Sequence, residues 1–493
     1  MSIKPNHDLI SCIFLRLLGL IYLIAFISVW TQIDGLIGSN GILPIKDFLL
    51  SIEDYGGKDK YFMIPSVFWF NQSDYFLHLI CFGGVLFSIL LIVNMLTSLS
   101  LILLWIFYLS ICTVSQEFLS FQWDALLLET GFLSIFLLPL NLSFKPRLLL
   151  PSNTLVIWLF RILLFKFILF SGIVKLASGD LVWRNLTALT YHYQTQPLPN
   201  VISYYFHHLP LQFHKLSCLI TFFIELIVPF FIFGTRKMRL FAFLTFLFFQ
   251  LMIMITGNYC FFNLLAIALC FLLLDDSFLK SLRKHFPFNQ SNQIKILNWS
   301  KIILIPLFIL IILMNSIYLT RLFSVQSFWP VFVRQVYSFV VRFHSINSYG
   351  LFAVMTVKRP EIIIEGSNDG VHWLQYEFKY KPDKLNEPPP FIAPHQPRLD
   401  WQMWFAALST FRKNPWFINL CVSLLQDSKE VIRLLKHNPF PDSPPKYLRA
   451  IIYEYKFTSL KMKEKTGRWW KRKYLGVYFP AVRLNGKNLE IVQ

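Results

Sequence analysis

LVIWLFRILLFKFILFSGIVKL, residues 155–176, is an apolar run interrupted by only three basic side chains. Its length matches the ~20 residues of helix that are needed to cross the hydrocarbon core of a bilayer. Further apolar runs of spanning or near-spanning length occupy residues 12–30, 76–96, 99–114, 125–142, 216–233, 238–255, 261–274 and 299–319. The sequence therefore predicts a polytopic α-helical membrane domain of about nine spans, residues 1–321, and a C-terminal extramembrane mixed α/β domain, residues 322–493.

The composition of the whole chain agrees with a membrane protein. Of its 493 residues, 55% are hydrophobic and 15% are charged, whereas soluble domains contain about 25% charged residues. The run at residues 12–30 is long for the core of a signal peptide and no small-residue cleavage site follows it, so we expect an uncleaved first span. Six of the seven cysteines lie in or beside apolar runs, which argues against a disulfide framework and against a zinc cluster.

Basic residues in the short connections predict the orientation. Lys and Arg resist translocation, and they are concentrated at residues 145–147, 236–239 and 280–295. If these connections face the cytoplasm, an odd number of spans places the N-terminus inside and the C-terminal domain on the outer side, lumenal or periplasmic. The long segments 32–75 and 177–215 would lie on the same outer side.

Hydrophobic alternation replaces continuous apolar runs in the C-terminal domain. The residues predicted as strands are 351–357, 361–365, 371–380 and 453–457. The residues predicted as helices are 401–411, 416–425 and 428–435. The turn sequence SNDG at residues 367–370 predicts a β-hairpin, and the spacing of Asp427 and Glu430 fits a capping box at the start of the last helix.

The C-terminal domain is strongly basic, with 25 Lys and Arg against 13 Asp and Glu from Leu322 onward. A nucleic-acid partner is not expected on the outer side of a membrane. Two interpretations of this charge stay open: a basic surface that rests near anionic lipid headgroups, or a surface that docks an acidic client protein.

Two lysines lie within the 155–176 run. A charge inside the membrane costs enough free energy that we expect each lysine to have a charged partner or a function. Lys166 is expected to pair with an acidic residue on a neighbouring span, and Glu129 and Glu225 are the candidates. Lys175 lies close to the predicted outer boundary. It could be an interfacial anchor whose amine reaches the headgroups, or a desolvated amine that acts as a base.

The other ionisable residues are expected to have structural roles and not catalytic ones. Asp124 and Glu129 are five residues apart, so they do not stack as an i,i+4 pair, and we expect them to fix neighbouring helices. The adjacent His207 and His208 point apart, so no metal site is predicted. The sequence contains no Gly-rich phosphate loop and no HExxH, GxSxG or CxxC motif, and no cofactor is expected.

Ordered blocks of the C-terminal domain resemble the lipase maturation factor family. They are EIIIEGSNDGVHWLQYEFKYKP (361–382), PPPFIAPHQPRLDWQMWFAAL (388–408), NPFPDSPPKYLRAIIYEYKFT (438–458) and WWKRKYLGVYFP (469–480). The likeness extends into the membrane domain through FLSFQWDALLLETGFL (118–133), residues 170–199 and ELIVPFFIFG (225–234). The resemblance implies an endoplasmic reticulum membrane protein in animals, needed for homodimeric lipases to reach their active state, with a lumenal C-terminal domain. A bacterial relative would lie in the inner membrane.

A more distant likeness joins the membrane domain to the vitamin K-dependent carboxylase and horizontally transferred transmembrane group. In that group a lysine near the end of a span acts as the catalytic base. SGIVKLASGDLVW (171–183) is similar to that neighbourhood, and Lys175 is the matching position.

The leading hypothesis is a non-enzymatic assembly factor whose outer, aromatic-rich domain holds a partly folded client protein such as a lipase. The candidate client-binding residues are Trp373, His395, Trp401 and Trp404, with buried core as the alternative role for the tryptophans. Membrane lipids are the second expected partner.

The competing hypothesis is a membrane enzyme that acts on a lipid or quinone-like molecule. In this hypothesis Lys175 is the base, and His192 or Glu129 assists it.

Overall fold

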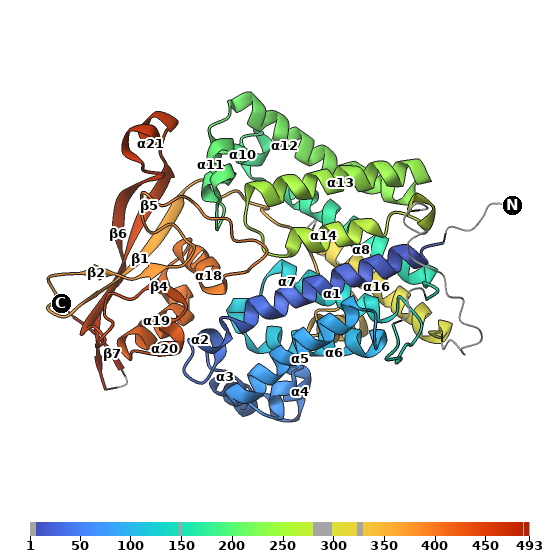
Figure 1. The fold of residues 1–493 in the computed structure, drawn as a ribbon, viewed down its shortest axis with the longest axis horizontal. Coiled ribbons are helices and arrows are strands. Elements are labelled where there is room, and N and C mark those ends of the chain that lie inside the picture. Colours follow the sequence, from blue (N-terminus) through green and yellow to red (C-terminus); the bar gives the residue numbers. More distant parts are fainter. Residues whose placement is uncertain (1–5, 147–149, 280–297, 323–328, 487, 493) are drawn as a thin grey trace.

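The N-terminal part of the chain is a bundle of apolar helices, and the C-terminal part is a sheet with its own helices (Figure 1). The computed structural model describes residues 6–146, 150–279, 298–322, 329–486 and 488–492. Within these residues, seven helices are long and apolar enough to cross a membrane. They are α1 (Asp8–Trp30), α5 (Asp74–Ile92), α6 (Thr97–Val114), α8 (Thr154–Ala177), α12 (Leu211–Leu226, continued by a 3-10 segment Val228–Phe233), α13 (Arg236–Thr256) and α16 (Lys301–Leu322). The predicted fold class is confirmed.

The two remaining predicted spans are short helices inside the bundle, α7 (Gln122–Ile135) and α14 (Phe262–Phe271). At 14 and 10 residues they fall below the ~17 residues needed to span lipid alone. Most of their side chains are buried, so protein rather than lipid surrounds them. The predicted span 125–142 was too long because α7 ends at Ile135, whose carbonyl accepts a hydrogen bond from Trp299 Nε1 at 3.2 Å.

Polar side chains begin two of these helices, α5 and α8, by accepting a hydrogen bond from a backbone N–H group that has no partner within the helix. Ser73 accepts from Phe76 N at the start of α5, and Asn153 accepts from Leu155 N at the start of α8. Each cap therefore satisfies one of the free donors at the start of its helix.

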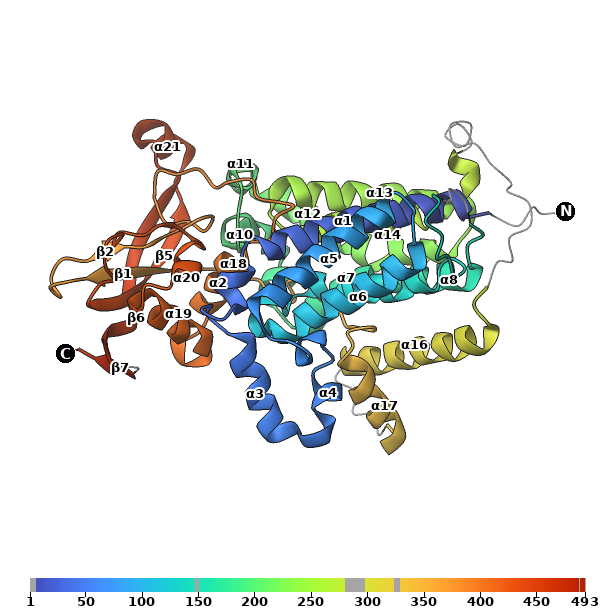
Figure 2. The same ribbon diagram turned by 60° about the horizontal axis from the view of Figure 1, so that its bottom comes forward.

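The bundle has two distinct ends. At the basal end, where α1 begins, Asp276 accepts hydrogen bonds from the backbone N–H groups of Leu9 and Ile10, and Arg236 forms an ion pair with Asp275. At the apical end, where α1 ends, the C-terminal domain packs against the helices (Figures 1 and 2). In the described part of the chain, nine successive helices alternate in direction between these ends, so the start of α1 and the C-terminal domain lie at opposite ends. The predicted basic connection at residues 236–239 is basal, whereas residues 147 and 280–295 lie outside the described residues.

Two long segments form the apical surface of the bundle. The first contains α2 (Ile33–Ile37), α3 (Ile45–Gly56) and α4 (Lys60–Met63), and the second contains α9 (Leu181–Arg184), α10 (Ala188–Thr195) and α11 (Val201–His207). Figure 2 shows α3, α4 and α17 (Val331–Val341) projecting from one side of the bundle. Tyr204 of α11 donates its hydroxyl hydrogen to the carbonyl of Thr458 at 3.0 Å, so the second segment touches the C-terminal sheet directly.

The C-terminal domain is built on a five-stranded antiparallel sheet in the order β2-β1-β5-β6-β7, with a separate two-stranded ribbon β3-β4. The strands are β1 (Arg359–Ser367), β2 (Leu374–Gln375), β3 (Glu377–Phe378), β4 (Leu435–His437), β5 (Tyr447–Phe457), β6 (Trp470–Asn485) and β7 (Asn488–Ile491). The helices are α18 (Arg398–Ala407), α19 (Pro415–Leu425), α20 (Lys429–Ile432) and α21 (Leu460–Thr466). Ile362, Ile364 and Ala450 project from one face of the sheet into the core that α18 and α19 cover.

The predicted elements of this domain are largely confirmed. The 367–370 turn joins β1 to β2 in a hairpin with Glu365 opposite Gln375, although the second strand is shorter than predicted. The predicted strand at 351–357 is wrong, because this segment bonds to the membrane domain instead, through Met355 N to Asp180 at 2.7 Å. The predicted capping box is also wrong: Ser428, not Asp427, caps α20.

Close contact between α1 and α5 depends on Gly84, and this contact can be tested. A Cβ atom at Gly84 would lie 2.2 Å from the ring of Phe26. We expect Gly84→Val to force the two helices apart and to lower the stability by about 1–3 kcal/mol. Thermal unfolding in detergent measures this, with Phe82→Leu as the control because the Phe82 side chain is 51% exposed. Equal melting temperatures for both variants would contradict the packing described here.

Candidate functional site

Glu129 neutralises the amine of Lys166 inside the bundle. Lys166 Nζ lies 2.6 Å from one carboxylate oxygen of Glu129, and both side chains are buried. The other oxygen accepts hydrogen bonds from the backbone N–H of Asn347 at 2.8 Å and the hydroxyl of Tyr349 at 2.7 Å. The predicted pairing of Lys166 is therefore confirmed. Because Asn347 and Tyr349 follow the last span, the pair also holds the start of the C-terminal segment against α7.

Lys175, nine residues further along the same helix α8, is paired in the same way. Its amine lies 2.9 Å from both carboxylate oxygens of Glu225 and 2.9 Å from the carbonyl of Ser171. The ring of Trp183 lies 5.3 Å from the amine, in cation–π range. The amine is buried, so it does not extend to an interface. These three acceptors occupy the hydrogen-bonding capacity of the amine.

His192 and Glu129 do not join Lys175 in one set of reacting groups. Nε2 of His192 lies 3.0 Å from the hydroxyl of Tyr259, and Glu129 is occupied by Lys166. Burial and the positive charge of Lys175 lower the pKa of His192 to about 4, so its ring is neutral at physiological pH. The three residues of the enzyme hypothesis therefore have separate partners.

A bidentate ion pair joins the C-terminal domain to the bundle at the apical end. Arg398, at the start of α18, places its two terminal nitrogens 2.6 and 2.8 Å from the carboxylate oxygens of Asp124 on α7. The hydroxyl of Tyr108 donates a further hydrogen bond to Asp124 at 2.5 Å. Both charged side chains are buried. Burial alone would lower the pKa of Arg398, but the adjacent carboxylate raises it above its ordinary value.

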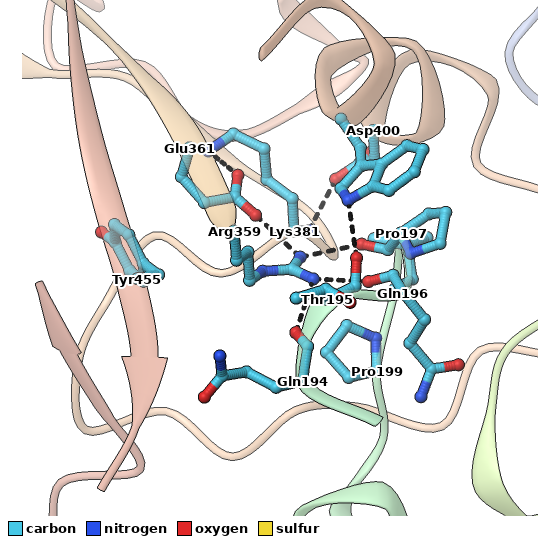
Figure 3. Close-up of polar contacts among 12 residues, drawn as sticks. Gln194, Thr195, Gln196, Pro197, Pro199, Arg359, Glu361, Lys381, Asp400 and Tyr455 are labelled. Carbon is cyan, nitrogen blue, oxygen red and sulfur yellow. Dashed lines mark hydrogen bonds and ion pairs between the residues drawn. The ribbon is translucent and has the colours of Figure 1, made fainter. Parts of the chain in front are cut away.

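A second buried arginine connects the sheet to the loop after α10 (Figure 3). Arg359 of β1 forms an ion pair with Glu361 at 2.7 Å. Its guanidinium also donates to the carbonyls of Gln194 at 3.1 Å, Gln196, and Pro197 at 2.8 Å. The loop carbonyls are thus bound by a charged donor instead of water, which fixes the loop against the sheet.

Behind Arg359 lies a compact group of buried acids and one lysine. Lys381, 1% exposed, lies between Glu361 at 3.5 Å and Asp383. Asp400 accepts the backbone N–H groups of Tyr380 and Lys381 at 2.8 and 2.9 Å. Burial raises the pKa of both Asp383 and Asp400 to about 6. The group fixes the segment after β3 beneath α18.

The four candidate client-binding residues occupy different environments. Trp401 is buried at the apical junction, where its ring lies 4.7 Å from that of Trp123. Trp404 is also buried and donates its indole N–H to the carbonyl of Thr195 at 2.9 Å. Trp373 is half-buried, and its ring lies 4.0 Å below the guanidinium of Arg449. The structure does not bring these tryptophans together.

His395 lines a cavity of about 300 Å³ at the junction between the two domains. The other lining residues are Thr31, Gln32, Lys379, Tyr380, Pro397, Leu399, Asp400 and Leu434. Nδ1 of His395 lies 3.0 Å from the hydroxyl of Ser28, so the histidine is anchored to α1. Burial and the positive charges of Arg398 and Lys379 lower the pKa of His395 to about 4.

Sequence reasoning missed Arg359, Arg398 and Lys381. The only signal was weak: Arg398 stands in an apolar, Pro-rich block, and Asp124 stands in an apolar helix, so each charge lacked a local partner. Their pairing spans 274 residues and becomes visible only in the fold.

The raised pKa of Asp400 gives a prediction about pH. Below about pH 4 its carboxyl is neutral in both the folded and the unfolded chain. Between about pH 4 and its folded pKa of about 6, the folded chain retains a proton that the unfolded chain has lost, so this contribution to stability falls as the pH rises. Asp400→Asn keeps an oxygen that accepts from Tyr380 and Lys381, and we expect it to be ~1–3 kcal/mol more stable than the native chain at pH 7.

Thermal unfolding from pH 4 to pH 7 measures this difference. The matched control is Asp442→Asn, on the exposed surface, which should leave the profile unchanged. An Asp400→Asn variant that is less stable than the native chain at pH 7 would show that the charge itself is needed.

Comparison with known proteins covers nearly the whole chain. Residues 9–281 match the family model "Lipase maturation factor transmembrane domain", and residues 345–480 match "Lipase maturation factor C-terminal domain". The chain is 36% identical to lipase maturation factor 2 of Xenopus laevis, over 98% of this chain and 84% of the relative. It is 34% identical to lipase maturation factor 1 of Mus musculus and 33% identical to that of Homo sapiens, each over 96% of this chain and 87% of the relative.

No solved structure matches the chain significantly. The predicted family is nevertheless confirmed, because both family models match in order and the relatives align with 96–98% of this chain. With seven helices of spanning length and a matching transmembrane-domain model, the chain is an integral membrane protein. It belongs to the lipase maturation factor family.

Proposed function

We propose that this chain assists the folding and assembly of lipases as a non-enzymatic factor in the endoplasmic reticulum membrane. The relatives are named lipase maturation factors, and they align with nearly the full length of the chain. The client is a secreted lipase, homodimeric in the leading case. Membrane lipids surround the helical domain, and nucleic acid has no part in this function.

The observation that carries the proposal is the fixed attachment of the C-terminal domain to the apical end of the bundle. Arg398 and Arg359 each bridge the two domains with buried, charge-assisted hydrogen bonds. Such an attachment presents the sheet at a constant position over the membrane. A client could fold against that surface while it stays close to the bilayer.

The basal position of Arg236 and Arg239 supports a lumenal C-terminal domain. Both arginines lie in the first turn of α13, directly after the short connection at residues 234–235, and Arg239 lies 3.7 Å from Asp275. Basic short connections remain in the cytoplasm, so the opposite, apical end faces the lumen. The boundary between the domains is proposed at residues 321/322, after the last span.

Trp373 and His395 are the proposed client-contacting residues, because Trp373 is half-exposed and His395 lines an open cavity. Trp401 and Trp404 support the surface from beneath. The enzyme alternative has no support: the relatives are named maturation factors, and Lys175 has three acceptors of its own.

The function can be tested in cells that lack their own lipase maturation factors. We expect the full chain, expressed with a homodimeric lipase, to raise the activity of the secreted lipase at constant lipase synthesis. The double variant Lys175→Met with Glu225→Leu removes both charges of one buried pair together, so we expect it to fold and to retain this activity.

The results separate the two hypotheses. Loss of lipase activity in a double variant that reaches normal abundance would favour the enzyme alternative. No rise in lipase activity with the native chain, present at normal abundance in the endoplasmic reticulum, would rule out the proposed function.

A further inference from the structure

One half of β6 forms an open edge of the sheet. β5 pairs with β6 from Phe457 opposite Trp470 to Leu448 opposite Val482. On the other side, β7 pairs only with the stretch from Val482 to Asn485. Among the described residues, no hydrogen bond reaches the outer edge of β6 between residues 471 and 477. This edge lies on the side of the sheet away from the helix bundle (Figure 1).

The backbone groups at this edge are placed to bind another strand. Trp470 donates its N–H to the carbonyl of Leu385 at 3.0 Å, away from β5. Successive residues of a paired strand direct their N–H and C=O groups to alternate sides. Arg472 and Tyr474 therefore also direct their backbone N–H and C=O groups outward. An added strand in the right register could form hydrogen bonds with these groups.

The side chains along the edge are basic and apolar. Lys471, Arg472 and Lys473 are exposed. The next apolar side chains are also exposed: Tyr474 by 56%, Leu475 by 51% and Val477 by 58%. Residues 456–473 contain eight Lys and Arg and one Glu. The guanidinium of Arg472 lies 4.4 Å from the ring of Tyr453, and Tyr453 packs against Tyr474 at 5.9 Å.

This charge pattern selects between possible occupants. Lysines on an open edge repel a second copy of the same strand, which prevents self-association. The same lysines attract an extended segment that carries carboxylates. Anionic headgroups would contact the basic side chains but not the outward backbone groups, and the edge lies away from the bundle.

We propose that the 471–477 edge of β6 binds an extended, acidic segment of the client protein as an added antiparallel or parallel strand. The added strand gains main-chain hydrogen bonds from β6 and ion pairs with Lys471 and Lys473. Apolar side chains of the segment pack on Tyr474 and Val477. This inference rests on the proposed function and adds to it the recognition chemistry of the client.

Binding of a labelled peptide to the full chain in detergent micelles tests the inference. The probe is fluorescein-labelled (Glu-Val)4, measured by fluorescence anisotropy. We expect it to bind with an affinity that falls as salt rises. The same peptide N-methylated at alternate residues on its pairing edge should bind at least about tenfold more weakly, because it cannot donate to β6. A (Lys-Val)4 peptide should not bind.

Variants of the chain test separately the contribution of main-chain hydrogen bonds and the contribution of the lysine charges. Tyr474→Pro removes one outward N–H without removing a bond to β5, and we expect at least about tenfold weaker binding. Lys471→Glu with Lys473→Glu should weaken binding about tenfold and reduce its salt dependence. Lys413→Glu, an exposed charge change on the helical side of the domain, should have no effect. Thermal unfolding identifies any variant that fails to fold, and the N-methylated peptide tests the native chain directly.

The outcomes distinguish this inference from the proposed function. Equal binding of the N-methylated and unmodified peptides, or displacement of the peptide by anionic phospholipid vesicles alone, would overturn strand addition in favour of a general anionic surface. If folded Tyr474→Pro still matures lipase as well as the native chain, the edge is not the client site although the proposed function stands. If the peptide binds as predicted but the native chain does not mature lipase, the β6 edge remains a strand-binding site and the proposed function is rejected.

Discussion

The guanidinium of Arg398 and the carboxylate of Asp124 are buried together where the two domains meet, and neither can be buried alone at acceptable cost. This requirement fixes the position of α18 on α7. It also brings Tyr108 and the carbonyl of Phe118 into the same hydrogen-bonded group, so α6 and the turn before α7 are held as well. The attachment of the C-terminal domain therefore depends on a charge that the membrane domain supplies.

Buried charges are paired with an opposite charge at three other places in the structure. Lys166 with Glu129, Lys175 with Glu225, and Arg359 with Glu361 are all buried ion pairs that also form hydrogen bonds with backbone carbonyls, N–H groups or hydroxyls. Two of them reach beyond their own domain, through Tyr349 and through the loop at Pro197. A factor that holds an unfolded client needs a surface that does not move with it, and these pairs account for such rigidity without enzymatic chemistry.

Lipid-length apolar runs predicted the spans because a helix in contact with lipid must be apolar over its whole length. The ranges predicted for α7 and α14 were too long. A helix that is surrounded by protein can be shorter than the bilayer, and the sequence alone does not show whether protein or lipid surrounds a helix. Lys166 was matched to an acidic partner, since its charge had to be neutralised. The partners of Arg359 and Arg398 were not foreseen, because their ligands are loop carbonyls and an aspartate hundreds of residues away. The strand at 351–357 failed because the backbone of this segment forms hydrogen bonds with Ser178, Asp180 and Trp183, which follow α8 in the sequence, and not with a sheet.

A double-mutant cycle on Asp124 and Arg398, measured by unfolding of the full chain in detergent, tests the central claim most directly. Asp124→Leu and Arg398→Met should each lower the unfolding free energy by about 3–5 kcal/mol, since each leaves one buried charge unpaired. The double variant should lose much less than the sum, with a coupling energy of at least ~2 kcal/mol. Additive losses within about 0.5 kcal/mol would contradict the claim that this pair holds the two domains together.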